Sequence, residues 1–286
     1  MYFLFFVISL FQILNPVQSS KSMQPIKSIN MIELTNDNFV SLRGPVTSTS
    51  IAKLITYLIE KTSDIRYIYL NTNGGSVNAG LKLINVIKDL EMSGIEVNCI
   101  ADTAISMGFV IFQSCTNRYV LSHSTLMQHQ MSLNGVGGKL LEINSYMSHI
   151  NNIEDELNGL QAERINISQT EFEDKISNDW WLTTSEAIKI NVADKIIQIK
   201  CNFKNEKEFV IINSIFGDIE LIYMKCPQVA TPVKINFKLN DSVNNSVNEH
   251  EIKNIIDSNY VKLDKINLNT ITPRYLDMFV DIIGNI

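Results

Sequence analysis

Three short segments of the sequence hold the residue types that acyl-transfer chemistry needs. Residues 73–77 include Gly74 and Gly75, whose free backbone N–H groups could meet a developing negative charge. Ser106 stands where an apolar helix is expected to begin, and its hydroxyl could act as a nucleophile once a base removes the proton. His129, at the end of a strand-like run, is the leading candidate for that base.

Each segment also has a purely structural interpretation. A Gly-Gly-Ser run is a common turn, a serine can cap a helix without doing chemistry, and an isolated histidine is usually structural or exposed. Of the 4 histidines, His123 lies in a Ser-His-Ser turn and His149 on a predicted helix, where solvation is expected. The segments indicate catalysis only when taken together, so the elements that position them matter.

Strands and helices alternate between residues 29 and 199. Apolar residues with a period of 3.6 predict helices, and short β-rich runs that end in Gly or Asn turns predict strands. The predicted strands are 29–34, 39–42, 65–70, 95–100, 119–121, 125–129 and 195–199. The predicted helices are 51–59 (capped by Ser48 or Ser50), the segment between Ser76 and Gly94, 104–115, 139–164, 170–176 and 185–190. This alternation is typical of an α/β fold with a mainly parallel sheet.

The pattern changes near residue 200. The predicted elements beyond it are strands at 209–215, 219–224 and 233–239, an Asn- and Ser-rich linker at 241–249 and a loosely helical segment at 251–286. We therefore expect three parts: a hydrophobic leader, an α/β domain and a C-terminal α+β extension of unknown fold. Their expected bounds are 1–20, 21–200 and 201–286.

The leader is almost wholly apolar from residue 2 to residue 14. This run is too short to cross a bilayer as a helix, which takes about 20 residues, but it suits a signal peptide with a small-residue cleavage site after Ser19. Because the leader contains no Lys or Arg, an uncleaved hydrophobic anchor and a misplaced start codon stay open. Cleavage would place the protein in the secretory pathway; otherwise we expect a cytoplasmic location.

Composition argues against several classes of protein. With 45% hydrophobic and 19% charged residues the chain is typical of a globular protein, and its net charge of -6 argues against a nucleic-acid partner. Its 4 cysteines form no Cys-x-x-Cys motif and no histidine falls at ligand spacing, so no metal site is expected. Cys99 and Cys115 are interpreted as buried small hydrophobes, whereas Cys201 and Cys226 could pair.

The order of the motifs resembles the ClpP family of self-compartmentalising serine proteases. The resemblance is carried by NTNGGSV (71–77), ISMGFVIF (105–112) and STLMQHQM (124–131), followed by a glycine-rich loop at 135–138 and a long helix. It runs from about residue 30 through LRGPV to TTSEAIKINVADKI. It implies the ClpP/crotonase fold, with repeated β-β-α units and a long protruding helix. Crotonases and signal-peptide peptidases share the Gly-Gly and serine-helix elements but lack the His-Gln motif at this place.

The resemblance also implies a role for each site residue. Ser106 would be the nucleophile and His129 the general base. The backbone N–H groups of Gly75 and Met107 would bind the oxyanion, and Gly74 would shape the turn. The implied activity is hydrolysis of peptide bonds in unfolded proteins or peptides through an acyl-enzyme, without a metal or cofactor.

The third member of the triad is where the sequence departs from the family pattern. Alignment on residues 184–187 without gaps puts Lys175 where the family has an Asp, with Asp174 one residue earlier and Asp179 four residues later. A shift of one residue turns a helical side chain by about 100°. Three possibilities stay open: a small helix shift lets Asp174 orient His129, the enzyme works as a Ser-His dyad, or the chain is an inactive relative. Asp179 has the weakest claim.

The resemblance also implies an assembly. In this family the long helix interdigitates with its counterpart from a facing ring, which implies a homo-oligomer of stacked rings. An ATPase ring of the AAA+ class would unfold substrates, because this chain has no P-loop motif. The main alternative is a non-catalytic ring subunit, which Lys175 favours; a crotonase-like acyl-CoA enzyme with the same oxyanion geometry is the second alternative.

Overall fold

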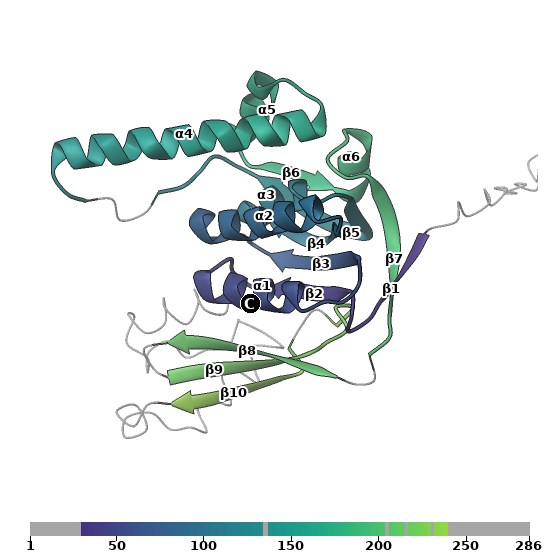
Figure 1. The fold of residues 1–286 in the computed structure, drawn as a ribbon. Coiled ribbons are helices and arrows are strands. Elements are labelled where there is room, and N and C mark those ends of the chain that lie inside the picture. The colour runs from purple at the N-terminus through teal and green to yellow at the C-terminus, as the bar shows by residue number, and fades with distance from the viewer. Residues whose placement is uncertain (1–29, 134–136, 204–205, 215–216, 230–231, 240–286) are drawn as a thin grey trace, which may run out of the picture.

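The computed structural model contains two β-sheets, helices that pack against the larger sheet, and one long helix that extends from the body (Figure 1). The described residues are 30–133, 137–203, 206–214, 217–229 and 232–239. The predicted leader 1–20 and the predicted linker and helical segment between 241 and 286 lie outside them.

The larger sheet places the carboxyl ends of its central strands together, where the candidate site lies. Its strands are β1 (Asn30–Leu34), β2 (Phe39–Arg43), β3 (Ile65–Thr72), β4 (Glu96–Ile105), β5 (Arg118–Gln128), β6 (Trp180–Thr183) and β7 (Lys195–Cys201). They are ordered β1-β7-β5-β4-β3-β2, and β6 pairs with β5 off this path. All pairs along the path are parallel, whereas β6 runs antiparallel to β5. The α/β class with a mainly parallel sheet is thus confirmed.

The helices follow the strands in the predicted alternation. They are α1 (Ser48–Ile59), α2 (Val77–Met92), α3 (Met107–Gln113), α4 (Leu140–Ile165), α5 (Gln169–Ile176) and α6 (Thr184–Lys189). Ser76 caps α2 as predicted, through a hydrogen bond from the Ala79 N–H to its hydroxyl, but α1 is capped by Thr47 instead of Ser48 or Ser50. The predicted strands 119–121 and 125–129 merge into the single strand β5.

Ser106 lies at the junction of β4 and α3, which differs from the predicted boundary. The apolar run 104–115 predicted one continuous helix, but β4 continues to Ile105 because it still pairs there with Met127 of β5. The helix begins only at Met107. Strand pairing between distant segments thus outweighs the local apolar pattern, and the serine falls in a strand-to-helix turn.

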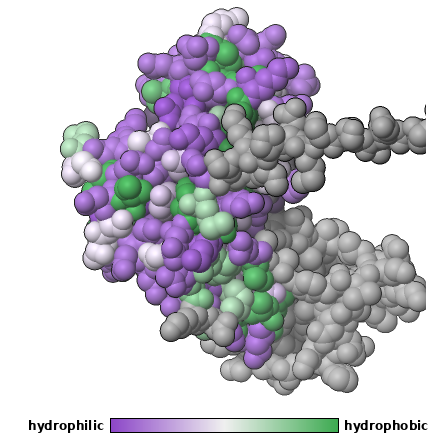
Figure 2. Space-filling view, turned by 90° about the vertical axis from the view of Figure 1, so that its right-hand side faces the viewer, coloured by the Kyte–Doolittle hydropathy of each residue, from purple (hydrophilic) through white to green (hydrophobic). Residues whose placement is uncertain are grey.

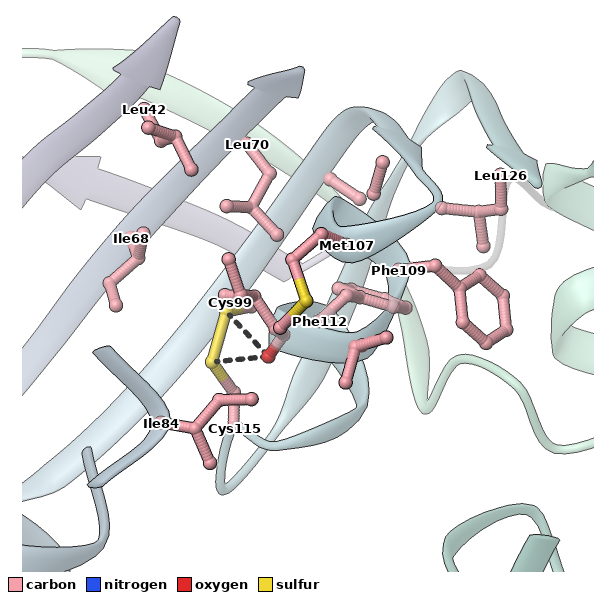
Figure 3. Close-up of a cluster of buried hydrophobic side chains, with 14 of the residues drawn as sticks. Leu42, Ile68, Leu70, Ile84, Cys99, Met107, Phe109, Phe112, Cys115 and Leu126 are labelled. Carbon is pink, nitrogen blue, oxygen red and sulfur yellow. Dashed lines mark hydrogen bonds between the residues drawn. A yellow bond between two sulfur atoms is a disulfide. The ribbon is translucent and has the colours of Figure 1, made fainter. Parts of the chain in front are cut away.

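The main core lies between the larger sheet and helices α1 to α3, where Leu70 and Phe112 are fully buried (Figure 3). Cys99 and Cys115 are buried in this core as predicted, but their interpretation as unpaired small hydrophobes is wrong. The two side chains form a disulfide, and both sulfurs lie near the Ile111 carbonyl oxygen (Figure 3). The pairing links β4 to the chain just beyond α3.

The smaller sheet is antiparallel and is built from the chain beyond residue 201. Its strands β8 (Lys207–Ser214), β9 (Gly217–Met224) and β10 (Lys234–Leu239) match the three predicted ones, in the order β10-β9-β8. Arg43 of β2 anchors this sheet, because its guanidinium donates to the carbonyl oxygens of Met224 at 2.9 Å and Lys225 at 3.2 Å. Cys201 and Cys226 form the disulfide that the sequence allowed.

Helix α4 is anchored at one end only. Its buried residues all come from its C-terminal part: Leu157, Asn158, Gln161, Ala162 and Ile165. The opposite end extends beyond the body (Figure 1) and exposes Leu140 by 73% and Leu141 by 80%. On the side of the molecule where β1 and β7 lie, hydrophilic residues cover most of the described surface (Figure 2). Within the described part of the chain, no helix has the length and apolar character needed to cross a membrane.

Candidate active site

Ser106 occupies a strained turn that holds its hydroxyl free for chemistry. Its backbone has φ 55° and ψ -120°, a region that residues with a Cβ rarely adopt. Its N–H donates to the Met127 carbonyl oxygen at 2.9 Å, which ties the turn to β5. The side chain makes no capping hydrogen bond to α3, so the interpretation as a simple helix cap does not apply. A serine on a sharp strand-to-helix turn is the geometry of a nucleophile elbow.

The turn between β3 and α2 lies directly against the Ser106 turn. Gly74 has φ 90°, and a Cβ placed on it would lie 2.6 Å from the Ile105 carbonyl oxygen and 2.7 Å from the Ser106 Cβ. Gly75 has φ 142°, and its backbone pairs with Val46 in an isolated bridge. The backbone conformation therefore requires glycine at both positions, and an added Cβ would meet the Ser106 turn at Gly74 and the backbone of Val46 at Gly75.

We expect Gly74→Ala to lower the free energy of unfolding by more than the strain of a left-handed backbone alone would. Gly94 supplies the control, because it has φ 82° and nothing within 4 Å of an added Cβ. Gly94→Ala should cost about 1 kcal/mol of unfolding free energy from backbone strain. Gly74→Ala should cost about 1 kcal/mol more because its Cβ meets neighbouring backbone. Urea unfolding of both variants measures the difference, and equal losses would contradict the close packing.

His129 directly follows β5 and is half-buried. Its backbone N–H donates to the side-chain oxygen of Gln128 at 3.3 Å. His123 and His149 are exposed, as expected. In the residues that the structure describes, the imidazole of His129 forms neither a hydrogen bond nor an ion pair with Ser106 or with a carboxylate.

One hollow brings most of the predicted site residues together. Its lining consists of Gly75, Val77, Ser106, Met107, Val110, Gln128, His129, Gln130, Met131, Ser132, Glu154, Leu157, Asn158 and Gln161. The predicted nucleophile, base and two oxyanion donors thus share a single surface, and Gly74 lies directly behind Ser106. Helix α4 forms one wall of this hollow, a contribution that sequence reasoning missed.

Asp174 and Lys175 lie on α5 and do not line this hollow. Asp174 is exposed, and its backbone carbonyl accepts a hydrogen bond from the Ser177 hydroxyl at 2.7 Å. The Lys175 ammonium lies 3.3 Å from Glu171 and 5.6 Å from the centroid of the Trp180 ring. Lys175 is therefore held against its own helix and β6, and it does not turn into the hollow.

Asp179 immediately precedes β6, and His129 immediately follows β5. β6 pairs antiparallel with β5, and Trp180 stands opposite Gln128. The pairing ends there, and in an antiparallel pair a ladder continued by one step would bring His129 opposite Asp179.

An ion pair between buried Arg118 and Asp194, whose side chain is 27% exposed, lies at the other end of β5. Arg118 is 2% exposed and its guanidinium contacts Asp194 at 2.6 Å. It also donates to Gln113 at 2.7 Å and to the carbonyl oxygen of Arg164, near the end of α4, at 3.3 Å. Burial raises the pKa of Asp194, but the hydrogen bonds and charge of Arg118 outweigh this effect and hold the pKa below its ordinary value.

Metal-ligating side chains do not gather in the described ranges. Among those residues, no group of three or more His, Cys, Asp or Glu side chains could hold a metal ion.

Comparison with known proteins identifies relatives across the region that holds the site. Residues 21–200 match the family model described as Clp protease. The ATP-dependent Clp protease proteolytic subunit 2 of Chlamydia trachomatis serovar D is 33% identical over 158 residues, covering 54% of this chain and 75% of that protein. The ATP-dependent Clp protease proteolytic subunit of Streptococcus sanguinis is 27% identical over 173 residues, covering 58% and 87%. The family match spans all of the predicted site residues.

Proposed function

Because the chain belongs to the Clp protease family, a family of peptidases, we propose that it is a serine endopeptidase that acts through an acyl-enzyme on Ser106. The observation that carries this proposal is the strained Ser106 turn beside the backbone of Gly75 and Met107, in one hollow with His129. The Ser106 side chain does not cap α3, and residues with candidate N–H donors line the same hollow. A serine in this position is suited to acyl transfer.

The proposed reaction has two halves. The Ser106 Oγ attacks the carbonyl carbon of the scissile peptide bond while its proton passes to His129, and the N–H groups of Gly75 and Met107 stabilise the oxyanion. The C–N bond then breaks and His129 returns the proton to the leaving amine. Water attacks the resulting ester with His129 again as base, which releases the carboxylic acid and restores the serine.

We propose Asp179 as the residue that orients His129. Its support is its position immediately before β6, the strand that pairs antiparallel with the end of β5, which His129 directly follows. A carboxylate at this place would hold one imidazole tautomer and stabilise the imidazolium formed when Ser106 loses its proton. The shift of one helical position that the Asp174 alternative needed is then unnecessary.

Assembly and partners form part of the same proposal. The relatives from Chlamydia and Streptococcus are named as proteolytic subunits of an ATP-dependent protease. We propose that this chain likewise forms stacked rings and receives unfolded protein from an ATPase partner. The apolar residues exposed on the free end of α4, such as Leu140 and Leu141, support a contact between copies at that end.

A fluorophosphonate probe tests the proposed chemistry, since it labels an activated serine covalently. We expect labelling of the wild-type protein, no labelling of Ser106→Ala, and unchanged labelling of Ser132→Ala, whose exposed serine lines the same hollow. Absence of Ser106-dependent labelling and of peptidase activity in a confirmed oligomer would instead favour the non-catalytic ring subunit. Turnover of acyl-CoA without covalent labelling would favour the crotonase-like alternative.

A further inference from the structure

The wall that α4 contributes to the hollow presents polar side chains next to the candidate nucleophile. Glu154, Leu157, Asn158 and Gln161 follow the spacing of one helix face, and all four line the hollow with Ser106. Two hydrogen bonds fix this face against the segment that carries His129. Gln128 donates to Gln161 at 2.7 Å, and the Met131 N–H donates to Glu154 Oε1 at 2.7 Å.

Asn158 is a buried polar side chain that lacks a protein partner. It is 8% exposed, and its amide makes no hydrogen bond to any residue in the described ranges. Buried polar groups are nearly always hydrogen-bonded, because leaving one unpaired costs free energy. An amide that is buried, unpaired and on the wall of an open hollow indicates that a ligand supplies the missing partner.

Glu154 gives the hollow a negative charge. Among the described lining residues it is the only Asp, Glu, Lys or Arg, and it is half-buried. One of its oxygens is occupied by the Met131 N–H, which leaves the other free to accept from a ligand. Val77, Val110 and Leu157 contribute apolar lining beside it. A side chain with an apolar stem and a cationic head matches this combination.

We infer that the hollow binds the lysine or arginine side chain of the residue whose carbonyl Ser106 attacks. This inference rests on the proposed peptidase function. The Cβ of that residue is two bonds from the attacked carbon, so its side chain must enter the space beside Ser106. The stem lies along the apolar lining, and the ammonium or guanidinium donates to Glu154 and to the Asn158 amide oxygen. Glu154 and Asn158 are thus specificity-determining residues.

Three fluorogenic peptides that differ only in this residue, carrying lysine, leucine or glutamate, test the inference on the full-length assembled protein. We expect kcat/KM for the lysine peptide to exceed that for the leucine peptide about tenfold, which is the effect of one charge-assisted hydrogen bond. The glutamate peptide should have the lowest kcat/KM of the three. Glu154→Gln keeps an acceptor for the Met131 N–H but removes the charge. It should lower kcat/KM for the lysine peptide about tenfold relative to that for the leucine peptide.

Glu156→Gln is the matched control, because Glu156 is an exposed carboxylate on α4 that does not line this hollow. It should keep the lysine preference. Protection of Ser106 from the fluorophosphonate probe gives a second readout that needs no turnover, and the lysine peptide should protect best.

Two results would overturn the inference in distinguishable ways. A leucine preference, or a lysine preference that survives Glu154→Gln, overturns the specificity while leaving a serine peptidase in place. Absence of both cleavage and Ser106 labelling overturns the peptidase function, and the inference with it.

Discussion

We expect Asp179→Asn to lower kcat about 10⁴-fold, whereas Asp174→Asn should leave kcat within about twofold of wild type. An asparagine in place of the orienting carboxylate keeps the size of the side chain but favours the wrong imidazole tautomer. It also removes the charge that stabilises the imidazolium once Ser106 has given up its proton. Asp174 lies on α5, outside the β5–β6 pair, so its substitution should leave the orientation of the imidazole unchanged.

The measurement is kcat for a single peptide substrate across pH 6 to 10, with Ser106 labelling to show that the site is intact. Asp179→Asn should lower the whole profile and slow labelling, while thermal unfolding of the protein changes little because Asp179 is exposed. A large loss in Asp174→Asn alone would support the helix-shift alternative. If neither variant loses activity, the enzyme works as a Ser-His dyad.

Much of this fold could be predicted from local sequence patterns. The helix after Ser76 and the glycine turn before it were predictable because capping, 3.6-residue periodicity and backbone freedom depend on residues that are near in sequence. The same holds for Ser106 and His129 as candidates, since each stands at the end of a recognisable element. Their presence in one hollow agrees with that expectation.

The missed features all depend on contacts between distant segments. The role proposed for Asp179 depends on the antiparallel pairing of β6 with β5. The Cys99–Cys115 pair joins a strand to the chain beyond α3, and each cysteine alone looks like a buried hydrophobe. The predicted helix at 104–115 shortens for the same reason, because pairing with β5 keeps Ile105 in a strand.

We expect Asp194→Ala to destabilise the protein by about 3–5 kcal/mol, because it leaves the guanidinium of Arg118 buried without its counter-charge. Glu33→Ala is the matched control, since it breaks an ion pair of similar type with Lys200 that is 48% to 62% exposed. That variant should lose less than about 1 kcal/mol. Urea unfolding of the two variants measures both losses, and similar small values would contradict a structural role for the buried pair.

The Arg118–Asp194 ion pair also makes the stability of the folded protein depend on pH, and stability is lost toward acid. The folded protein holds the pKa of Asp194 below the value of 3.8 expected for an unpaired Asp, so its contribution is fully present above that value. It is lost as the pH falls through the lower folded pKa, and Asp194→Ala should remove this part of the acid sensitivity. Arg118 also donates to the carbonyl oxygen of Arg164 near the end of α4. Loss of Asp194 should free the Arg118 side chain to move, and this should loosen α4, which forms a wall of the hollow. Peptidase activity of Asp194→Ala should therefore fall at temperatures below its unfolding midpoint, whereas Glu33→Ala should keep wild-type activity there.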